Sequence, residues 1–370
     1  MTEALPEYRS ALELAALIRE RELSPVEVVE ALPQLKERLD HLAASKQFTG
    51  AVLVARGDQV LFRQVYGKAN YEQDTPFALD TRFRLASVSK QFTAVAVLKL
   101  QDEGKLSVDD PVCKWIEPCP DAWRPLRIHH LMSHTSGIPD VMAQAEWGRI
   151  RVTHRTPQEL TETSARYGLQ FEPGTKVRYN NAAFNLAAEI VSKASGQPFE
   201  TYMEQAILKP LGMKDTGSDV NDDAQGLAMG YGLFPAGLTP QPIANVSVVA
   251  GAGALYSTLD DMLAWNRSLH QGHVLSDKAY ADLRMRNEPL AEMTQIKGTS
   301  ETHPSLSPND EWANFEIMES YIGRAKAITK FSGGYVRDAL KAGIIMQDNK
   351  GYNPFKFGFI GASDTHNAAP

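Results

Sequence analysis

The sequence predicts an α/β protein of the α+β kind, in which an antiparallel hairpin is combined with a set of helices. Two patterns carry this prediction: residues 50–70 form strand-like runs around a turn pair, and several other segments show helical spacing of apolar residues. The third observation is size. A chain of 370 residues with 43 % hydrophobic residues is ample for a real core, and suggests two domains or one large domain with appendages.

The first stretch, residues 1–40, has a helical pattern. Apolar residues recur there at three- and four-residue spacing, at Leu12, Leu14, Leu17 and Ile18. Ser24 followed by Pro25 is an N-cap with a proline at the first helical position, which signals that a second helix begins. We therefore expect a pair of amphipathic surface helices.

The second stretch runs from about residue 41 to about residue 276 and mixes both patterns. Two runs rich in Val, Leu and Phe flank Gly57-Asp58, a favoured hairpin turn. Residues 87–107 follow with a helical pattern that closes near Gly104. Three further helices are expected within residues 156–168, 180–196 and 258–272, separated by connections rich in Gly and Pro.

The third stretch runs from about residue 277 to residue 370 and differs from the second in its pattern of polar and apolar residues. Residues 284–312 are polar and predict loops, whereas residues 357–363, FGFIGAS, predict one buried strand followed by a polar turn. We therefore expect three parts: an N-terminal helical extension at 1–40, a main domain at 41–276 and a C-terminal segment at 277–370.

Charge and cysteine content exclude several classes of protein. The net charge of −7 argues against a general binder of nucleic-acid backbones, and no apolar run approaches the about 20 residues of a membrane-spanning helix. The first residues of the sequence contain neither the basic nor the apolar region of a secretory signal, so a cytoplasmic enzyme or binding protein is expected.

We expect Cys113 and Cys119 to be small buried residues, with one disulfide bridge between them as the alternative. The oligomeric state stays open.

The strongest chemical signal is the pair Ser87 and Lys90 in FRLASVSKQFTA. Side chains three residues apart lie on one helical face, so the ammonium group reaches the hydroxyl. A serine needs such a neighbour, because it is a poor nucleophile until its proton is taken or its alkoxide is stabilised. An isolated match of this kind occurs by chance on many helices.

A second signal is the run Tyr179-Asn180-Asn181 before another helical pattern. A tyrosine next to a positive charge loses its proton more easily and can act as a general base. The amide of Asn181 offers to hold a substrate carbonyl or the lysine. The structural alternative is a packed tyrosine ring and an asparagine that caps a helix.

These motifs resemble the serine β-lactamase-related hydrolases: class C β-lactamases, D-alanyl-D-alanine carboxypeptidases and similar esterases. The matching text lies at residues 81–112, 128–140, 171–217 and 250–276. The resemblance implies a serine β-lactamase/transpeptidase-like fold, with an antiparallel sheet and a helical domain. It also implies that Ser87 is the acylated nucleophile, Lys90 its partner and Tyr179 the base, with Asn181 in the substrate site. Small esters, amides or β-lactams would be the substrates, with neither a cofactor nor a metal.

A third motif of that family, a Lys or His, a short residue and a Gly on a strand beside the nucleophile, has no clear counterpart. His270-Gln271-Gly272 fits the letters but follows a helical pattern, and Lys330 to Gly333 fits loosely. This strand supplies one N–H of the oxyanion hole, and losing one such donor typically costs about 10²–10³ in rate. We therefore expect that the C-terminal strands of the fold are missing or replaced.

The flanking segments resemble other families. The C-terminal text is similar to a family of unknown function related to PHP-type metal-dependent phosphoesterases, and Asp364 with His366 is the kind of pair that binds a divalent metal. Glu301 and His303 are further candidates, but the opening His-x-His of that fold is absent, which favours a metal-free segment. The N-terminal helices resemble the leader of amidase-signature enzymes without their catalytic segment.

The leading hypothesis is a serine hydrolase acting through Ser87. The alternatives are a catalytically impaired mosaic relative, or a metal-dependent phosphoesterase acting through Asp364 and His366. A cluster of His129, His130 and His134 also suggests a metal site, but we interpret it as a structural turn.

Overall fold

The computed structural model describes residues 32–221, 224–234, 237–241, 244–271, 274–277, 279, 290–295, 298–299, 345–346, 349 and 358–361. The chain divides into two compact units. One comprises Lys36–Leu283, and the other comprises Met1–Leu35 and Arg284–Pro370. Of the predicted N-terminal helices, the structure describes α3, Leu32–Ala44. The Ser24-Pro25 signal lies outside the described residues.

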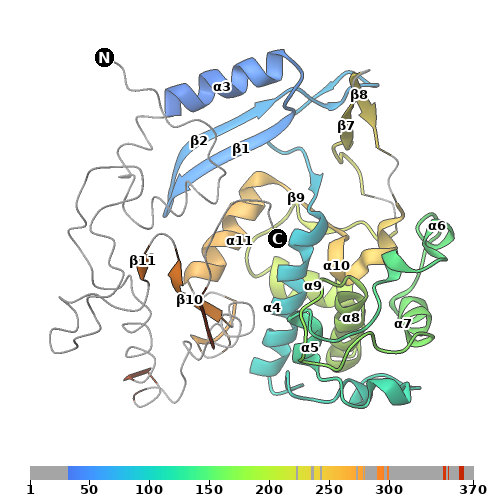
Figure 1. The fold of residues 1–370 in the computed structure, drawn as a ribbon. Coiled ribbons are helices and arrows are strands. Elements are labelled where there is room, and N and C mark those ends of the chain that lie inside the picture. The colour runs from blue at the N-terminus through green and yellow to red at the C-terminus, as the bar shows by residue number, and fades with distance from the viewer. Residues whose placement is uncertain are drawn as a thin grey trace. The chain divides into compact units, whose positions relative to one another are not determined.

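The predicted hairpin is confirmed. Strands β1 (Gly50–Arg56) and β2 (Gln59–Tyr66) pair antiparallel, and Gly57 in the turn has a φ of +57°, which a glycine adopts without steric cost. Helix α11 (Leu259–Gln271) lies beside this hairpin in Figure 1, and side-chain hydrogen bonds join the two. Asp260 accepts two hydrogen bonds from Arg63 at 2.8 Å, and Arg267 donates to the carbonyl of Asp58 at 2.8 Å.

Helices α4 (Ser89–Asp102) and α8 (Ala182–Ser195) form the centre of the core, side by side in Figure 1. Residues 92–98 of α4 and 182–191 of α8 are buried throughout, because neighbouring elements cover both helices on several sides. Trp265 of α11 stacks on Phe92 with ring centroids 3.8 Å apart. Both helices, and α11, confirm the sequence prediction.

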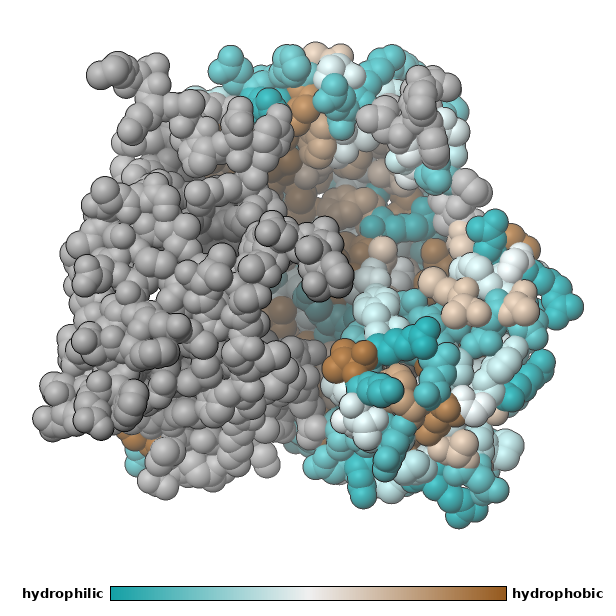
Figure 2. Space-filling model, in the orientation of Figure 1, coloured by the Kyte–Doolittle hydropathy of each residue, from teal (hydrophilic) through white to brown (hydrophobic). Residues whose placement is uncertain are grey.

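Shorter helices surround this pair. Helix α7 (Pro157–Ala165), also predicted, begins with a capping box in which Thr156 and Glu159 satisfy each other's backbone N–H. The other α-helices are α5 (Ile128–Met132), α6 (Trp147–Ile150), α9 (Phe199–Met203) and α10 (Ala250–Gly253). A π-helical turn spans Glu204–Leu208, and 3₁₀ turns span Ala86–Val88, Val112–Lys114, Asp121–Trp123, Val141–Ala143 and Val246–Val249. Over α6, α7 and the loops beside them the surface is mainly hydrophilic (Figure 2).

Short strands complete the Lys36–Leu283 unit. Strands β5 (Phe83–Arg84), β9 (Leu255–Ser257) and β6 (Gly217–Ser218) form an antiparallel sheet in that order. Two-stranded sheets are made by β3 (Lys68–Asn70) with β4 (Thr75–Pro76), and by β7 (Tyr231–Phe234) with β8 (Gly237–Pro240). The three-stranded sheet matters for function, because β5 leads directly into the turn that carries Ser87.

The other unit contains a sheet of β11 (Gly298–Thr299), β10 (Leu290–Gln295) and β12 (Gly358–Gly361). Strand β12 confirms the strand predicted in FGFIGAS. Residues 284–312 were expected to be rich in loops, and the structure adds two strands there, β10 and β11, that the sequence did not predict. Strand β10 pairs in parallel with β12, a partner more than 60 residues away, and such pairing leaves no local signal in a polar segment.

The two cysteines form a disulfide, so the expectation of two small buried residues without a bridge is wrong. The 3₁₀ turn Val112–Lys114 redirects the chain, and the Cα atoms of Cys113 and Cys119 lie 5.3 Å apart, a spacing that a bridge spans. Both side chains are partly buried against the main core. None of the helices within the described ranges is long and apolar enough to cross a membrane.

Candidate active site

Ser87 is the middle residue of the 3₁₀ turn Ala86–Val88, and helix α4 begins at the residue after this turn, Ser89. The turn is anchored to the three-stranded sheet: Leu85 donates its N–H to the carbonyl of Leu255 at 2.8 Å, and Ser89 Oγ accepts the N–H of Leu255 at 3.2 Å. Ser87 therefore sits beyond the N-terminus of a buried helix, where the helix dipole favours negative charge.

The residue before Ser87 has an unusual backbone. Ala86 has a φ of +46°, which is rare for a residue with a Cβ atom. Such strained conformations persist only where the surroundings impose them, and they concentrate at functional sites. Here the sheet on one side and α4 on the other impose it.

Lys90 is buried, and its ammonium group has three hydrogen-bond acceptors. Nζ donates to Ser87 Oγ at 3.1 Å, to Asn181 Oδ1 at 2.8 Å and to the carbonyl of Ala252 at 2.9 Å. Three acceptors match the three N–H donors of an ammonium group. The structure thus brings the predicted pair into contact, and adds the carbonyl of α10 as a partner that sequence reasoning did not identify.

Tyr179 approaches the same serine from the segment before α8. Its Oη lies 2.6 Å from Ser87 Oγ, within hydrogen-bond distance, and Lys90 Nζ lies 4.7 Å from the centre of its ring. The side chain is 52 % exposed, so a substrate can reach the hydroxyl. Ser87, Lys90 and Tyr179, which the sequence singles out, therefore converge at one hydroxyl group.

The two asparagines after Tyr179 have different surroundings. Asn180 Oδ1 accepts the N–H of Ala183 at 2.7 Å, which caps the start of α8. Asn181 directs its Oδ1 to Lys90 instead, and its Nδ2 donates to Asp140 Oδ2 at 3.0 Å. Of the two contacts that the sequence left open for the amide of Asn181, the structure contains the one with the lysine.

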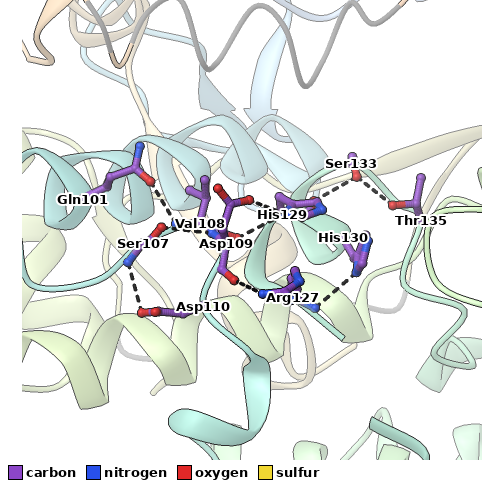
Figure 3. Close-up of polar contacts among 10 residues, drawn as sticks. All are labelled: Gln101, Ser107, Val108, Asp109, Asp110, Arg127, His129, His130, Ser133 and Thr135. Atoms are coloured by element: carbon purple, nitrogen blue, oxygen red, sulfur yellow. Dashed lines mark hydrogen bonds and ion pairs between the residues drawn. The ribbon is translucent and has the colours of Figure 1, made fainter. Parts of the chain in front are cut away.

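The three histidines lie in two different settings. His129 pairs with Asp109 at 3.1 Å, and His130 Nδ1 accepts the N–H of Arg127 at 3.1 Å, in the polar network of Figure 3. His134 lies beyond α5, and its ring packs against the ring of Tyr179 with centroids 4.6 Å apart. Its Nδ1 accepts the N–H of Asn180 at 3.1 Å.

Burial lowers the pKa of His134 below its ordinary value, and the positive charge of Lys90 lowers it further, against an opposing effect of Asp140. A neutral ring is consistent with an Nδ1 that accepts a hydrogen bond. Sequence reasoning assigned His134 to a structural turn without connecting it to Tyr179, and it missed Asp140 altogether. The run HTSGIPD carries both, but it contains no spacing rule that points to α8.

Several other candidates are placed differently. His270 lies inside α11, so His270-Gln271-Gly272 is not a strand motif. Lys330 to Gly333, Glu301, His303, Asp364 and His366 lie outside the described residues. Within the described ranges no group of three or more His, Cys, Asp or Glu side chains is arranged to hold a metal ion.

Comparison with known proteins finds relatives of several hydrolytic kinds. D-alanyl-D-alanine-carboxypeptidase/endopeptidase AmpH of Escherichia coli K12 is 29 % identical over 335 residues, covering 88 % of this chain and 84 % of AmpH. Esterase EstB of Burkholderia gladioli is 34 % identical over 193 residues, and this match covers 48 % of the chain and 49 % of EstB. The solved structure of EstCE1, a hydrolase with promiscuous acyltransferase activity, matches with a TM-score of 0.60 and 25 % identity, over 70 % of this chain and 77 % of EstCE1.

Two family models match the chain. A protein family of unknown function, DUF3604, matches residues 263–370, which agrees with the resemblance of the C-terminal segment to a family of that kind. The Beta-lactamase model matches residues 35–304 and so includes the helices and the sheet that carry Ser87, Lys90 and Tyr179. The solved structures confirm the serine β-lactamase/transpeptidase-like fold. The chain belongs to the Beta-lactamase family of serine hydrolases.

Proposed function

We propose that this protein hydrolyses small esters or amides, β-lactams among them, through an acyl-enzyme on Ser87. One observation carries the proposal. The Ser87 hydroxyl lies within hydrogen-bond distance of both Tyr179 Oη and Lys90 Nζ, although Tyr179 is 92 residues away in the chain. A serine flanked by a proton acceptor and a fixed cation is an activated nucleophile.

In the first half-reaction Ser87 Oγ attacks the substrate carbonyl and its proton passes to Tyr179 Oη, which acts as the general base in its phenolate form. The Lys90 ammonium group, which donates to Ser87 Oγ, stabilises the negative charge on the attacking oxygen. The tetrahedral intermediate collapses, the carbon–oxygen or carbon–nitrogen bond breaks, and the leaving group takes the proton from Tyr179. An ester bond to Ser87 remains.

In the second half-reaction a water molecule attacks that ester. Tyr179 accepts the proton of the water and returns it to Ser87 Oγ as the carboxylic acid leaves. The atoms balance with water as the only co-reactant, so the proposed chemistry needs neither a cofactor nor a metal. Asn181, which holds Lys90, is also proposed to contact the substrate.

The choice of esters and amides has separate support. The relatives that the chain matches are named as a carboxypeptidase/endopeptidase and an esterase, and EstCE1 is named for acyl transfer. Three exposed apolar side chains also lie next to the catalytic residues. Val88 follows Ser87, Val177 precedes Tyr179 by two residues, and Met142 Sδ lies 3.4 Å from Asn181 Nδ2.

A serine-reactive phosphonate tests the proposal. The purified protein is incubated with the reagent and its intact mass is recorded, in parallel with Ser87→Ala. We expect a single adduct on the wild-type protein and none on the variant. Panels of esters, amides and β-lactams then identify which acyl groups turn over.

The matched control is Ser192→Ala, which removes a hydroxyl that donates to the carbonyl of Ala188 in α8, away from the site. We expect it to be labelled as wild type is. A folded wild-type protein without an adduct, or an adduct that persists on Ser87→Ala, would show that Ser87 is not an activated nucleophile.

A further inference from the structure

The side-chain amide of Asn181 lies between two groups of opposite charge. Its Oδ1 accepts from Lys90 Nζ at 2.8 Å, and its Nδ2 donates to Asp140 Oδ2 at 3.0 Å. An ammonium group only donates hydrogen bonds and a carboxylate only accepts them. The amide therefore satisfies both neighbours in one orientation, with its oxygen toward Lys90. In the opposite orientation the Asn181 amide would direct its N–H groups at the Lys90 ammonium and its oxygen at the Asp140 carboxylate, so neither hydrogen bond could form.

Asp140 is itself held firmly. Its Oδ2 also accepts the backbone N–H of Asn181 at 2.7 Å, and its Oδ1 accepts the N–H of Met142 at 2.9 Å. Hydrogen bonds from N–H groups to a carboxylate are about twice as strong as those between neutral groups. The Asp140 carboxylate thus connects the loop of residues 134–140 to the start of α8. Two backbone N–H groups fix the position of this carboxylate.

We propose that Asp140 is a positioning residue of this active site, which orients the amide of Asn181 so that the amide oxygen holds the Lys90 ammonium group against Ser87. This inference rests on the proposed function, because it assigns Asp140 a task in activating Ser87. Asp140 acts through Asn181: the structure places its carboxylate against Asn181 and the N–H of Met142.

The consequence for Lys90 follows from its surroundings. The ammonium group is buried, and its contact with Asn181 is the shortest of its three hydrogen bonds. Without the Asp140 carboxylate the Asn181 amide is free to turn. Lys90 then loses the amide oxygen as its hydrogen-bond acceptor and faces the amide N–H groups instead. A buried charge that loses a partner moves or becomes costly to keep, so its contact with Ser87 weakens.

The same loop supports the neighbouring residues. His134 accepts the N–H of Asn180 and packs on the ring of Tyr179, while Asn180 Nδ2 donates to the carbonyl of Ile138. One loop therefore holds the run of residues 179–181 at several points, and Asp140 contributes the contact that reaches Lys90.

A double-mutant cycle tests the inference. Wild type, Asp140→Ala, Asn181→Ala and the double variant are labelled with the phosphonate over a range of concentrations. We expect Asp140→Ala to lower the maximal labelling rate at least tenfold in the wild-type background and less than twofold in the Asn181→Ala background, because Asp140 acts through that amide. Asp140→Asn, which keeps the size but not the charge, should also be slow.

Asp110→Ala is the matched control. The Asp110 carboxylate likewise accepts a backbone N–H, that of Ser107 at 3.1 Å (Figure 3). It also pairs with Lys114 and makes no contact with the site residues. We expect this control to lose stability in urea but to keep its labelling rate when folded.

An Asp140→Ala variant that labels at the wild-type rate, or that slows by the same factor in both backgrounds, would overturn the inference alone. A wild-type protein that takes no label would overturn the proposed function, and the inference with it. The two failures are therefore distinguishable.

Discussion

At the scale of single residues, His134 couples the site to pH. Its ring is partly buried beside Lys90, and burial lowers its pKa below the ordinary histidine value of 6.5. The unfolded chain therefore binds a proton at a pH where the folded protein does not. By linkage, the stability that His134 contributes is present above about pH 6.5 and is lost as the pH falls below that value.

This gives a prediction for His134→Gln, whose side chain is polar and does not titrate. We expect the free energy of unfolding of the wild-type protein to fall more steeply than that of the variant between pH 7.5 and pH 5. Urea unfolding at several pH values measures both slopes. All other groups are common to both proteins, so the difference isolates His134, and parallel slopes would contradict its lowered pKa.

Individual residues differ in how far sequence reasoning could place them. Ser87 and Lys90 are one helical turn apart, and that spacing alone brings them together. Tyr179 was found through its neighbours in the chain and a family resemblance. The contacts of His134 and Asp140 with residues 179–181 could not be predicted, because they depend on the path of a loop more than 40 residues away in sequence.

At the scale of elements, the close approach of α10 to α8 sets the position of one Lys90 acceptor. Gly251 makes this approach possible. A Cβ atom at this position would lie 2.2 Å from the carbonyl oxygen of Phe184 and 2.7 Å from the Cβ of Ala188. Both are closer than real Cβ contacts, and neither belongs to a flexible side chain, so α10 would have to move.

We therefore expect Gly251→Ala to lower the free energy of unfolding by about 1–3 kcal/mol, as overpacked cores do. It should also slow phosphonate labelling, because the next residue, Ala252, supplies a carbonyl acceptor to Lys90. The control is Gly148→Ala in α6, where a Cβ atom meets no neighbour within 4 Å. That variant should be neutral or slightly more stable. Equal stability of the two variants in urea would show that α10 tolerates a displacement.

The elements that the sequence predicts are the long ones with a strong pattern. The hairpin, α4, α7, α8 and α11 each combine a periodic run with a turn or cap residue, such as Gly57 or Thr156. Strands β5, β6 and β9 have two or three residues each, too few for a period to show. Strand β10 exists through its pairing with β12, which no local pattern reports.

At the scale of the whole molecule, the active-site residues of the Lys36–Leu283 unit lie on or next to the helices that form its hydrophobic core. A single cluster of buried residues extends from Leu85 to Ala279 and includes α4, α8 and Trp265 of α11. Lys90 lies on α4, and Asn181 directly precedes α8, the other central helix of that cluster. Since α4 and α8 cannot separate without exposing this cluster to water, Ser87 should stay activated until the core itself unfolds.

We therefore expect loss of labelling and loss of core packing at the same urea concentration. The buried side chains Trp123 and Trp265 report packing by their fluorescence, and Trp312→Phe removes the tryptophan that belongs to the other unit. In this variant, short labelling pulses after equilibration at each urea concentration should trace the same midpoint as the fluorescence. A labelling midpoint at clearly lower urea would mean that residues 134–140 or 179–181 leave the core first, because those contacts, unlike the α4–α8 packing, consist mainly of hydrogen bonds.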